Sequence, residues 1–592
     1  TRPVLSPYKG LSQLLQVSGT RVVGESSSPL GLVTVVESPR IPLRHAPGLS
    51  LQASQWPPEQ RAIFTDGDGM TAVTRNTGDI SQFGYLDQMT SSLPYHLGKP
   101  EKVLVLGAGG GSAVLQARYH GVEQIDAVEL NPGVADLLRG EYADYTGRLF
   151  EGNGTELHVA EARGFVATHE RLYDLIQIVL LDSFSTSSAG LYALSESYLY
   201  TVEALEAYME HLAPGGHLAI SRWVKLPPRD TLKLFATAIA ALESMGVDNP
   251  GERLVLIRSW QTSTLLIGNA PFTSTEIEAL RDFCRARSFD LGYYPGMGSA
   301  EANRYNILDQ AYFYQGSRSL LSGQRQAFME DYKFRLQPAT DDQPYFFHFF
   351  KWRVVPELLA LRGQGGLPLL EMGYPILVAT LVQAVLASFI LILLPLLILK
   401  RNDGRPASAS RRRSSLLYFS MLGLAFLFIE MAFIQRFTLF LHHPLYSISV
   451  VLAAFLLFAG IGSAWSNRFV DDKKRTVAIK WAIVGIITLG LGYLLILAPL
   501  FSSLAGLPVM FKAIVSIALI APLGFCMGVP FPLGLARLNK AAPELIPWAW
   551  GINGCASVIS AVLATLLAIH LGFSMVVLWA LVFYAIAAVS VP

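Results

Sequence analysis

KVLVLGAGGGSAVLQARYHGVEQIDAVE, residues 102–129, is the stretch that decides the fold of the first half of this chain. Residues 103–106 are a short apolar run, which is typical of a parallel strand buried on both faces. Gly107, Gly109 and Gly111 follow directly, and glycines permit a tight turn and a close approach of the backbone to a ligand. The stretch therefore predicts a buried strand followed by a sharp, ligand-facing turn.

Glu129 completes this pattern. Residues 112–119 predict a helix, and residues 125–128 predict a second strand that ends at this acid. Glu129 lies about 20 residues past the glycines, where nucleoside-binding folds place a carboxylate on the ribose hydroxyls. The order of strand, glycine loop, helix, strand and acid predicts a nucleoside-type pocket. The alternative is a tight strand-to-helix turn in an α/β domain that binds nothing.

Composition divides the chain into a soluble part and a membrane part. The 592 residues are too many for one domain, and 52% of them are hydrophobic, with a mean hydropathy of +0.39. The excess lies in residues 374–592, where apolar runs of about 20 residues are each long enough to cross a bilayer. The net charge of +1 gives no indication of nucleic acid as a partner. Three widely separated cysteines show no metal-ligand spacing, so no metal site is predicted.

Residues 101–270 alternate between predicted strands and helices. LHVAEARGFV predicts a strand that ends near Glu161, and LYDLIQIVLLDSF predicts a central strand that ends at Asp182. Doubly wound sheets bind ligands at the carboxyl ends of their strands. We therefore expect the glycine loop, Glu129, Glu161 and Asp182 to share one rim. Residues 1–100, in contrast, contain short apolar segments broken by Ser, Pro and Gly, which are typical of β-hairpins.

Basic residues mark alternate loops of the membrane part. They occur between the first and second, the third and fourth, and the fifth and sixth of seven predicted spans. By the positive-inside rule these loops are cytoplasmic, which places the soluble part outside the cytoplasm. The spans are predicted near residues 374–399, 415–435, 445–464, 480–500, 509–530, 548–569 and 572–591.

The segment TDDQPYFFHFFKW stands just before the membrane part. Its Phe and Trp residues suit the interface of a bilayer. The paired acids Asp341 and Asp342 precede this aromatic cluster. A helix cap or loop is the preferred interpretation of these acids, and a functional site is the alternative.

The motifs VLVLGAGGGSAVL, AVELNP, EARGF, LLDSF and LAPGGHLAISRW together resemble the spermidine synthase (polyamine aminopropyltransferase) family. With the runs FIEMAFIQRFTLFL and MGVPFPLGL, the chain is similar to bacterial inner-membrane proteins that join such a domain to a multi-pass helical bundle. The resemblance implies an α/β Rossmann-like methyltransferase fold, a doubly wound sheet with a β-rich N-terminal lead-in. An all-α transmembrane bundle of about seven helices follows it.

The same resemblance assigns domains and a cofactor. Residues 1–100 form the β-rich segment, 101–350 the spermidine synthase-like domain, 351–373 an interfacial linker and 374–592 the bundle. The implied cofactor is S-adenosylmethionine or decarboxylated S-adenosylmethionine. The three glycines of the loop would line the nucleoside. Glu129 would hold the ribose hydroxyls, and Glu161 with Ala162 would flank the adenine. These cofactor-binding residues are Gly107, Gly109, Gly111, Glu129, Glu161 and Ala162, and Asp182 would begin the gate loop.

Two departures from the family argue against ordinary polyamine synthesis. The family loop reads Gly-Gly-Gly-Asp-Gly, and Gly110 stands here at the Asp position. The second Asp of the family gate, which takes a proton from the attacking amine, is replaced by Ser185. A primary amine has a pKa of about 10 and is mostly protonated at neutral pH, and serine is no base there without a partner.

Two functions from different classes remain. The first is a transferase that moves a methyl or related group to a substrate at the membrane surface, with Asp182, Ser183 and Ser185 as its candidate catalytic residues. The second is an inactive relic domain without cofactor, serving as an extracytoplasmic scaffold or as a transport component of a membrane complex. The expected partner is the lipid bilayer, with other membrane subunits as further candidates. Because S-adenosylmethionine is cytosolic, a working transferase would instead place the domain in the cytoplasm.

Overall fold

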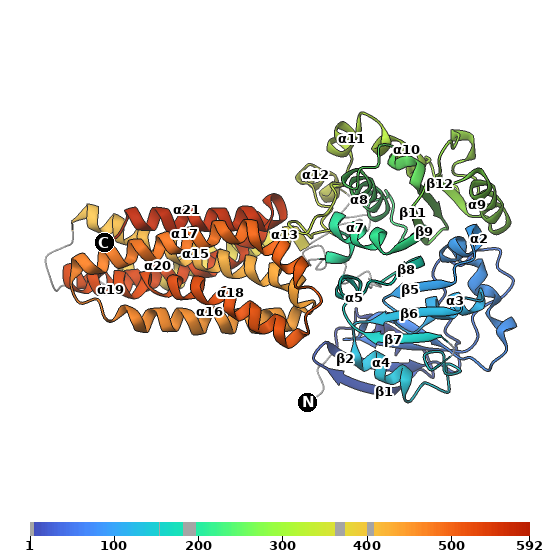
Figure 1. The fold of residues 1–592 in the computed structure, drawn as a ribbon, viewed down its shortest axis with the longest axis horizontal. Coiled ribbons are helices and arrows are strands. Elements are labelled where there is room, and N and C mark those ends of the chain that lie inside the picture. Colours follow the sequence, from blue (N-terminus) through green and yellow to red (C-terminus); the bar gives the residue numbers. More distant parts are fainter. Residues whose placement is uncertain (1–4, 153, 182–196, 361–372, 399–407) are drawn as a thin grey trace. The chain divides into compact units, whose positions relative to one another are not determined.

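The computed structural model describes residues 5–152, 154–181, 197–360, 373–398 and 408–592. The chain divides into two compact units, Thr1–Gly373 and Tyr374–Pro592 (Figure 1). The first unit is α/β and the second is helical, and each is described by itself.

An eight-stranded sheet forms the centre of the first unit, with the order β12-β10-β11-β9-β8-β5-β6-β7. The neighbours from β9 to β7 pair in parallel, and those from β9 to β12 pair antiparallel. This is the predicted α/β sheet, and antiparallel strands extend it beyond β9. The strands are β5 (Lys102–Leu106), β6 (Gln124–Glu129), β7 (Thr155–Val159), β8 (Tyr173–Val179), β9 (Leu212–Trp223), β10 (Leu254–Arg258), β11 (Thr262–Gly268) and β12 (Asp290–Tyr293).

Helices cover both faces of this sheet, so β5 is buried on both sides (Figure 1). Val103 and Val105 enter one hydrophobic core, and Leu104 and Leu106 enter the other. This arrangement explains why the strand is apolar at successive positions rather than alternate ones. The first core contains residues of α3 (Ser112–Tyr119), α4 (Pro132–Arg139) and α9 (Ser274–Arg287), and the second contains residues of α5 (Ala162–Thr168), α7 (Val202–Glu210) and α8 (Asp230–Ser244).

A separate antiparallel sheet of four strands precedes the large sheet, which confirms the β-rich lead-in. Its order is β1-β2-β3-β4. Asp66 and Gly67 both have positive φ, 51° and 77°, as a two-residue hairpin turn between β3 and β4 requires. The strands are β1 (Arg21–Ser28), β2 (Gly31–Glu37), β3 (Gln60–Thr65) and β4 (Asp68–Thr74).

The second unit is a bundle of apolar helices. Six helical segments of the described residues are long and apolar enough to cross a membrane. The seventh predicted span, near 572–591, is the shorter apolar helix α21 (Phe573–Val589). The six segments are Gly373–Ile398, Ala409–Leu441 (α15), Pro444–Ser466 (α16), Asp472–Ser503 (α17), Val509–Ala541, which contains α18 (Val509–Gly528), and Pro543–Leu571, which contains α20 (Ile546–Leu571).

Glycines set the closest contact within this bundle, between α16 and α18. A Cβ added to Gly462 would lie 2.1 Å from the carbonyl oxygen of Phe525. A Cβ added to Gly528 would lie 2.0 Å from that of Ala459. Small residues allow helix backbones in membranes to approach this closely. The backbones of these two helices therefore approach closely where residues 459–462 meet residues 525–528.

Candidate functional site

The glycine loop is tied to the end of β6 by its backbone. Gly107, Gly109 and Gly111 have φ values of +80°, +49° and +91°, in the left-handed region that favours glycine. The N–H groups of Gly107 and Ala108 both donate to the carbonyl oxygen of Val128, at 2.9 and 2.8 Å. The three predicted glycines are thus required by the turn itself.

Glu129 is held by backbone donors at both carboxylate oxygens, and one of these donors belongs to the glycine loop. Its Oε2 accepts from the N–H of Gly109 at 2.9 Å, and its Oε1 accepts from the N–H of Asn131 at 2.8 Å. Burial raises the pKa of Glu129 above that of an ordinary glutamate, and the backbone donors oppose this shift. The structure therefore brings together two elements that the sequence predicted to share a rim.

Glu161 lies at the end of the next strand and caps a helix. Its Oε2 accepts from the N–H of Gly164 at 2.7 Å, as an N-cap side chain does. Burial raises its pKa as well. The N–H of Ala160 donates to the carbonyl oxygen of Glu129 at 3.1 Å, which places the two acids on adjacent strand ends. Ala162 begins α5 and is buried in the core beneath.

The three candidate catalytic residues, Asp182, Ser183 and Ser185, lie outside the described residues. The chain leads toward them from directly beside the glycine loop. Leu180 has a positive φ of 47°, and any side chain on Gly107 would overlap the side chain of Leu181. The segment after β8 thus starts at the same rim as Gly107.

The N-terminal sheet supplies a contact that the sequence did not reveal. The N–H of Gly110 donates to Thr71 Oγ1 of β4 at 2.8 Å. A Cβ added to Gly110 would lie only 2.2 Å from the carbonyl oxygen of Ala72. The β4 backbone therefore occupies the space into which a side chain at position 110 would extend.

A second unpredicted contact joins the rim to the TDDQP segment. Arg163, two residues after Glu161, donates to Asp341 through Nη1 at 2.5 Å and Nη2 at 2.6 Å. Asp341 also accepts from Thr201 Oγ1 at 2.8 Å. Although burial acts to lower the pKa of Arg163, its hydrogen bonds and ion pair with Asp341 raise it. This bidentate pair is the stronger kind of charge-assisted hydrogen bond.

The TDDQP segment, residues 340–344, also forms hydrogen bonds with residues just before and within α7. The N–H of Ser197 donates to the carbonyl oxygen of Pro344 at 2.7 Å. The N–H of Asp341 donates to Glu203 Oε2 at 2.9 Å. Burial and the nearby charge of Asp341 raise the pKa of Glu203 to about 7. The sequence favoured a helix cap or loop for Asp341 and Asp342, with a functional site as the alternative, and it indicated neither of these contacts.

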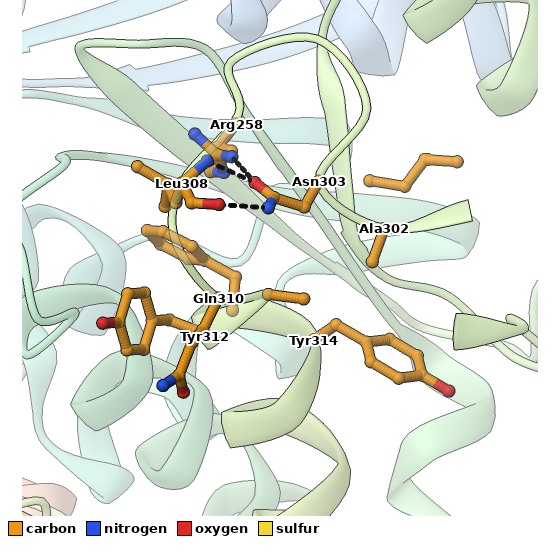
Figure 2. A pocket seen from close by; sticks show the side chains of 10 residues that line it. Arg258, Ala302, Asn303, Leu308, Gln310, Tyr312 and Tyr314 are labelled. Atoms are coloured by element: carbon orange, nitrogen blue, oxygen red, sulfur yellow. Dashed lines mark hydrogen bonds between the residues drawn. The ribbon is translucent and has the colours of Figure 1, made fainter. Parts of the chain in front are cut away.

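Figure 2 shows a small pocket, which Leu291 of β12 helps to line and which no residue of the rim lines. Its volume is about 10 Å³, which is room for one water molecule. Arg258 Nη2 donates to Asn303 Oδ1 at 3.1 Å and lies 3.1 Å from Asp290 Oδ2. Asn303 Nδ2 in turn donates to the carbonyl oxygen of Leu308 at 2.7 Å. These contacts brace a loop and leave no space for a substrate.

Two groups of side chains have the composition of metal ligands, although the sequence predicts no metal site. An arginine accompanies each group: Arg287 pairs with Asp87, and Arg171 Nη1 lies 3.1 Å from Asp126 Oδ2. A cation in either place would lie beside a guanidinium group. The groups are Asp87, His96 and His120, and Asp126, Glu156 and His158.

Comparison with known families identifies the domain that carries the rim. Residues 82–221 match the family described as the spermine/spermidine synthase domain. These residues are a spermidine synthase domain. It contains the glycine loop, both acids and the start of the segment after β8.

Curated relatives of the spermidine synthase domain are polyamine aminopropyltransferases. The protein from Nitrosomonas europaea is 29% identical over 178 residues, 30% of this chain and 50% of that protein. The protein from Alkaliphilus oremlandii is 34% identical over 118 residues, 20% of this chain and 40% of that protein. The chain spans about half or less of the length of these relatives.

Solved structures that are similar to this chain include a spermidine synthase in complex with the transition state analogue AdoDATO. It is 18% identical, covers 44% of this chain and 78% of that chain, and gives a TM-score of 0.30. Human methyltransferase-like protein 13 in complex with SAH is 19% identical, covers 34% and 92%, and gives a TM-score of 0.25.

Replacing Gly110 by aspartate is expected to destabilise the chain. The new side chain must displace the β4 backbone, and overpacking of this kind costs about 1–3 kcal/mol. Thermal unfolding of the full chain in detergent measures the effect as a lower Tm. The matched control is Gly98→Asp, because Gly98 has extended backbone and no atom within 4 Å of its added Cβ. An unchanged Tm for Gly110→Asp would show that β4 does not sit on the loop.

Glu203→Gln is expected to stabilise the chain at alkaline but not at acidic pH. The folded pKa of about 7 exceeds the ordinary 4.5. The stability contributed by Glu203 is therefore complete below pH 4.5 and is lost as the pH rises through 7. We expect the variant to gain on the order of 1–3 kcal/mol at pH 8 and little at pH 4. Denaturant unfolding at both pH values checks this, with exposed Glu210→Gln as control; equal gains at both would contradict it.

Proposed function

We propose that the spermidine synthase domain binds an S-adenosylmethionine-type nucleoside at its glycine loop and transfers a methyl or related group to a membrane-proximal substrate. The single observation that carries this proposal is the position of Glu129. One of its oxygens accepts from the N–H of Gly109 in the loop at 2.9 Å, and the other accepts from the N–H of Asn131, two residues further along the chain, at 2.8 Å. A carboxylate has about four lone-pair sites, so two remain for the hydroxyls of a ribose.

The residues that fit such a ligand come from one rim. The left-handed backbone of Gly109 and Gly111 shapes the loop that would face the ligand, and Glu129 would accept from the two ribose hydroxyls. Glu161 already accepts from the N–H of Gly164, which leaves its second oxygen for a polar edge of the base. When bound, the sulfonium ligand supplies an activated group and a neutral thioether leaving group. The chain then has only to position the acceptor and exclude water.

Ordinary polyamine synthesis is disfavoured by the space around Gly110 as well as by Ser185. The family places an acid at the position of Gly110, and here the β4 backbone occupies the path of any side chain. Activation of a protonated amine needs a base, and Ser185 is no base at neutral pH without a partner. An acceptor that is already nucleophilic, or one activated by another group, fits the site better.

The second candidate is a relic domain that serves as an extracytoplasmic scaffold or transport component. The observation that favours it is the distribution of basic residues over alternate loops of the bundle. Arg468, Lys473 and Lys474 lie in one such region, and Arg537 and Lys540 in another. If these ends face the cytoplasm, the first unit is separated from the cytosolic pool of S-adenosylmethionine.

Glu129→Gln is expected to weaken nucleoside binding at least tenfold, because an amide accepts fewer hydrogen bonds from the ribose than a carboxylate does. Isothermal titration of the full chain in detergent with S-adenosylmethionine, its decarboxylated form and methylthioadenosine measures this. Glu123→Gln, an exposed acid just before β6, is the matched control. Binding to the wild type should also weaken as the pH falls toward the raised pKa of Glu129, because protonation removes an acceptor. Absence of binding at millimolar ligand would favour the relic domain.

Orientation is tested by cysteine labelling in intact cells. The native cysteines are first replaced by serine, and a single cysteine is placed at exposed Ser27 or at exposed Asn467, which follows α16. If the basic ends are cytoplasmic, a membrane-impermeant maleimide should label Ser27→Cys and should label Asn467→Cys only after lysis. The opposite pattern would place the first unit in the cytoplasm, with direct access to the cofactor.

A further inference from the structure

We propose that a groove between α16, α17 and α18 binds one anionic phospholipid. Its phosphate would lie on Lys473 and Lys474, and its acyl chains would lie against Trp465 and Trp481. This site belongs to the bundle and is independent of the nucleoside rim. It goes beyond the proposed transfer reaction, since it gives the bundle a ligand of its own.

The groove has the size of a ligand site. Its volume is about 500 Å³, within the roughly 300–1,000 Å³ of small-molecule sites. Aromatic side chains and two lysines account for most of its wall, and the lysines are the only charged residues that line it. The exposed lining is almost wholly apolar, so Lys473 and Lys474 face the groove with their aliphatic stems. An apolar groove with two exposed lysines on its wall matches the division of a phospholipid into acyl chains and headgroup. The residues of this wall are Trp465, Phe469, Lys473, Lys474, Trp481 and Phe525.

Close packing of α16 on α18 builds the aromatic wall. Gly462 allows the backbone of Phe525 to approach, and the Phe525 ring then lies 5.5 Å from that of Trp465 between centroids. Trp465 also contacts Phe469 edge-on, with centroids 4.8 Å apart. These rings support one another from two helices, so the wall exists without a ligand.

The two lysines are available for a headgroup. Both are exposed in the first turn of α17, and no ion pair of either is seen among the described residues of the bundle. The nearest acid in sequence, Asp472, pairs instead with Arg475 at 3.0 Å and Lys540 at 3.4 Å. The backbone N–H of Lys474 donates to the capping side chain of Asp471, which fixes where the turn begins. The ammonium groups of Lys473 and Lys474 are therefore available to a ligand or to solvent.

The aromatic residues locate this site at the edge of the apolar zone. Trp481 is 70% exposed and lies two turns beyond the lysines. Tryptophan at the level of the headgroups, with lysine just outside, is the arrangement of a membrane interface. Clustered lysines beside apolar spans attract anionic rather than zwitterionic lipids. Charge and shape together select a phospholipid with a net negative headgroup.

Native mass spectrometry of the delipidated full chain tests this proposal. Titration with phosphatidylglycerol should give one tightly held lipid, and phosphatidylcholine should bind at least tenfold more weakly. The double variant Lys473→Gln/Lys474→Gln should lose at least tenfold in affinity for phosphatidylglycerol. Lys480→Gln is the matched control, since Lys480 is an exposed lysine of the same helix that does not line the groove.

Each other outcome overturns the assignment. Equal affinity of the double variant and the wild type would remove the lysines from the site. Equal affinity for both lipids would leave only an ordinary lipid-facing surface. Competition by inorganic phosphate at millimolar concentration would reassign the lysines to a free anion. Trp481→Ala, which keeps both lysines, should weaken phosphatidylglycerol binding without altering Tm, and an unchanged affinity would contradict the acyl-chain contact.

Discussion

The hydrogen bonds between the glycine loop and the end of β6 determine the rest of the site. Gly107 and Ala108 donate to the carbonyl oxygen of Val128, and Gly109 donates to the side chain of Glu129. These bonds hold the backbone in a conformation that residues with a Cβ rarely adopt. They also fix the carboxylate beside the start of α3. Without these bonds the loop would have no fixed conformation. Glu129 and Thr71 would then lose their contacts with Gly109 and Gly110.

Segments from both ends of the first unit meet the rim formed by the glycine loop, Glu129 and Glu161. Thr71 of the N-terminal sheet binds Gly110, and Asp341 near the end of the unit pairs with Arg163 beside Glu161. The spermidine synthase domain is therefore enclosed by segments on either side of it in the chain. The β4 backbone leaves no room for a side chain at position 110, where the family pattern has an acid.

The bundle follows a different physical rule. Its helices bury little surface against water, so their association depends on close backbone packing at glycines such as Gly462 and Gly528. Tight packing of α16 on α18 leaves α17 to form the opposite side of an open groove. The proposed nucleoside rim in one unit and the proposed lipid groove in the other would give a single chain two kinds of ligand, as transfer to a membrane substrate requires.

The sequence by itself determined the strand and helix pattern, the glycine loop with Glu129, the α/β class and the apolar spans. Each of these features depends on the spacing of apolar residues or on the backbone conformations that glycine permits. Both can be read from residues that are close together in the sequence. Only the tertiary structure decided that Thr71 reaches Gly110 across 39 residues and that Asp341 reaches Arg163 across 178. It also decided that α16 and α18 leave a groove beside α17. Contacts between distant segments carry no periodic signature, because the energy that forms them arises only when the whole chain packs.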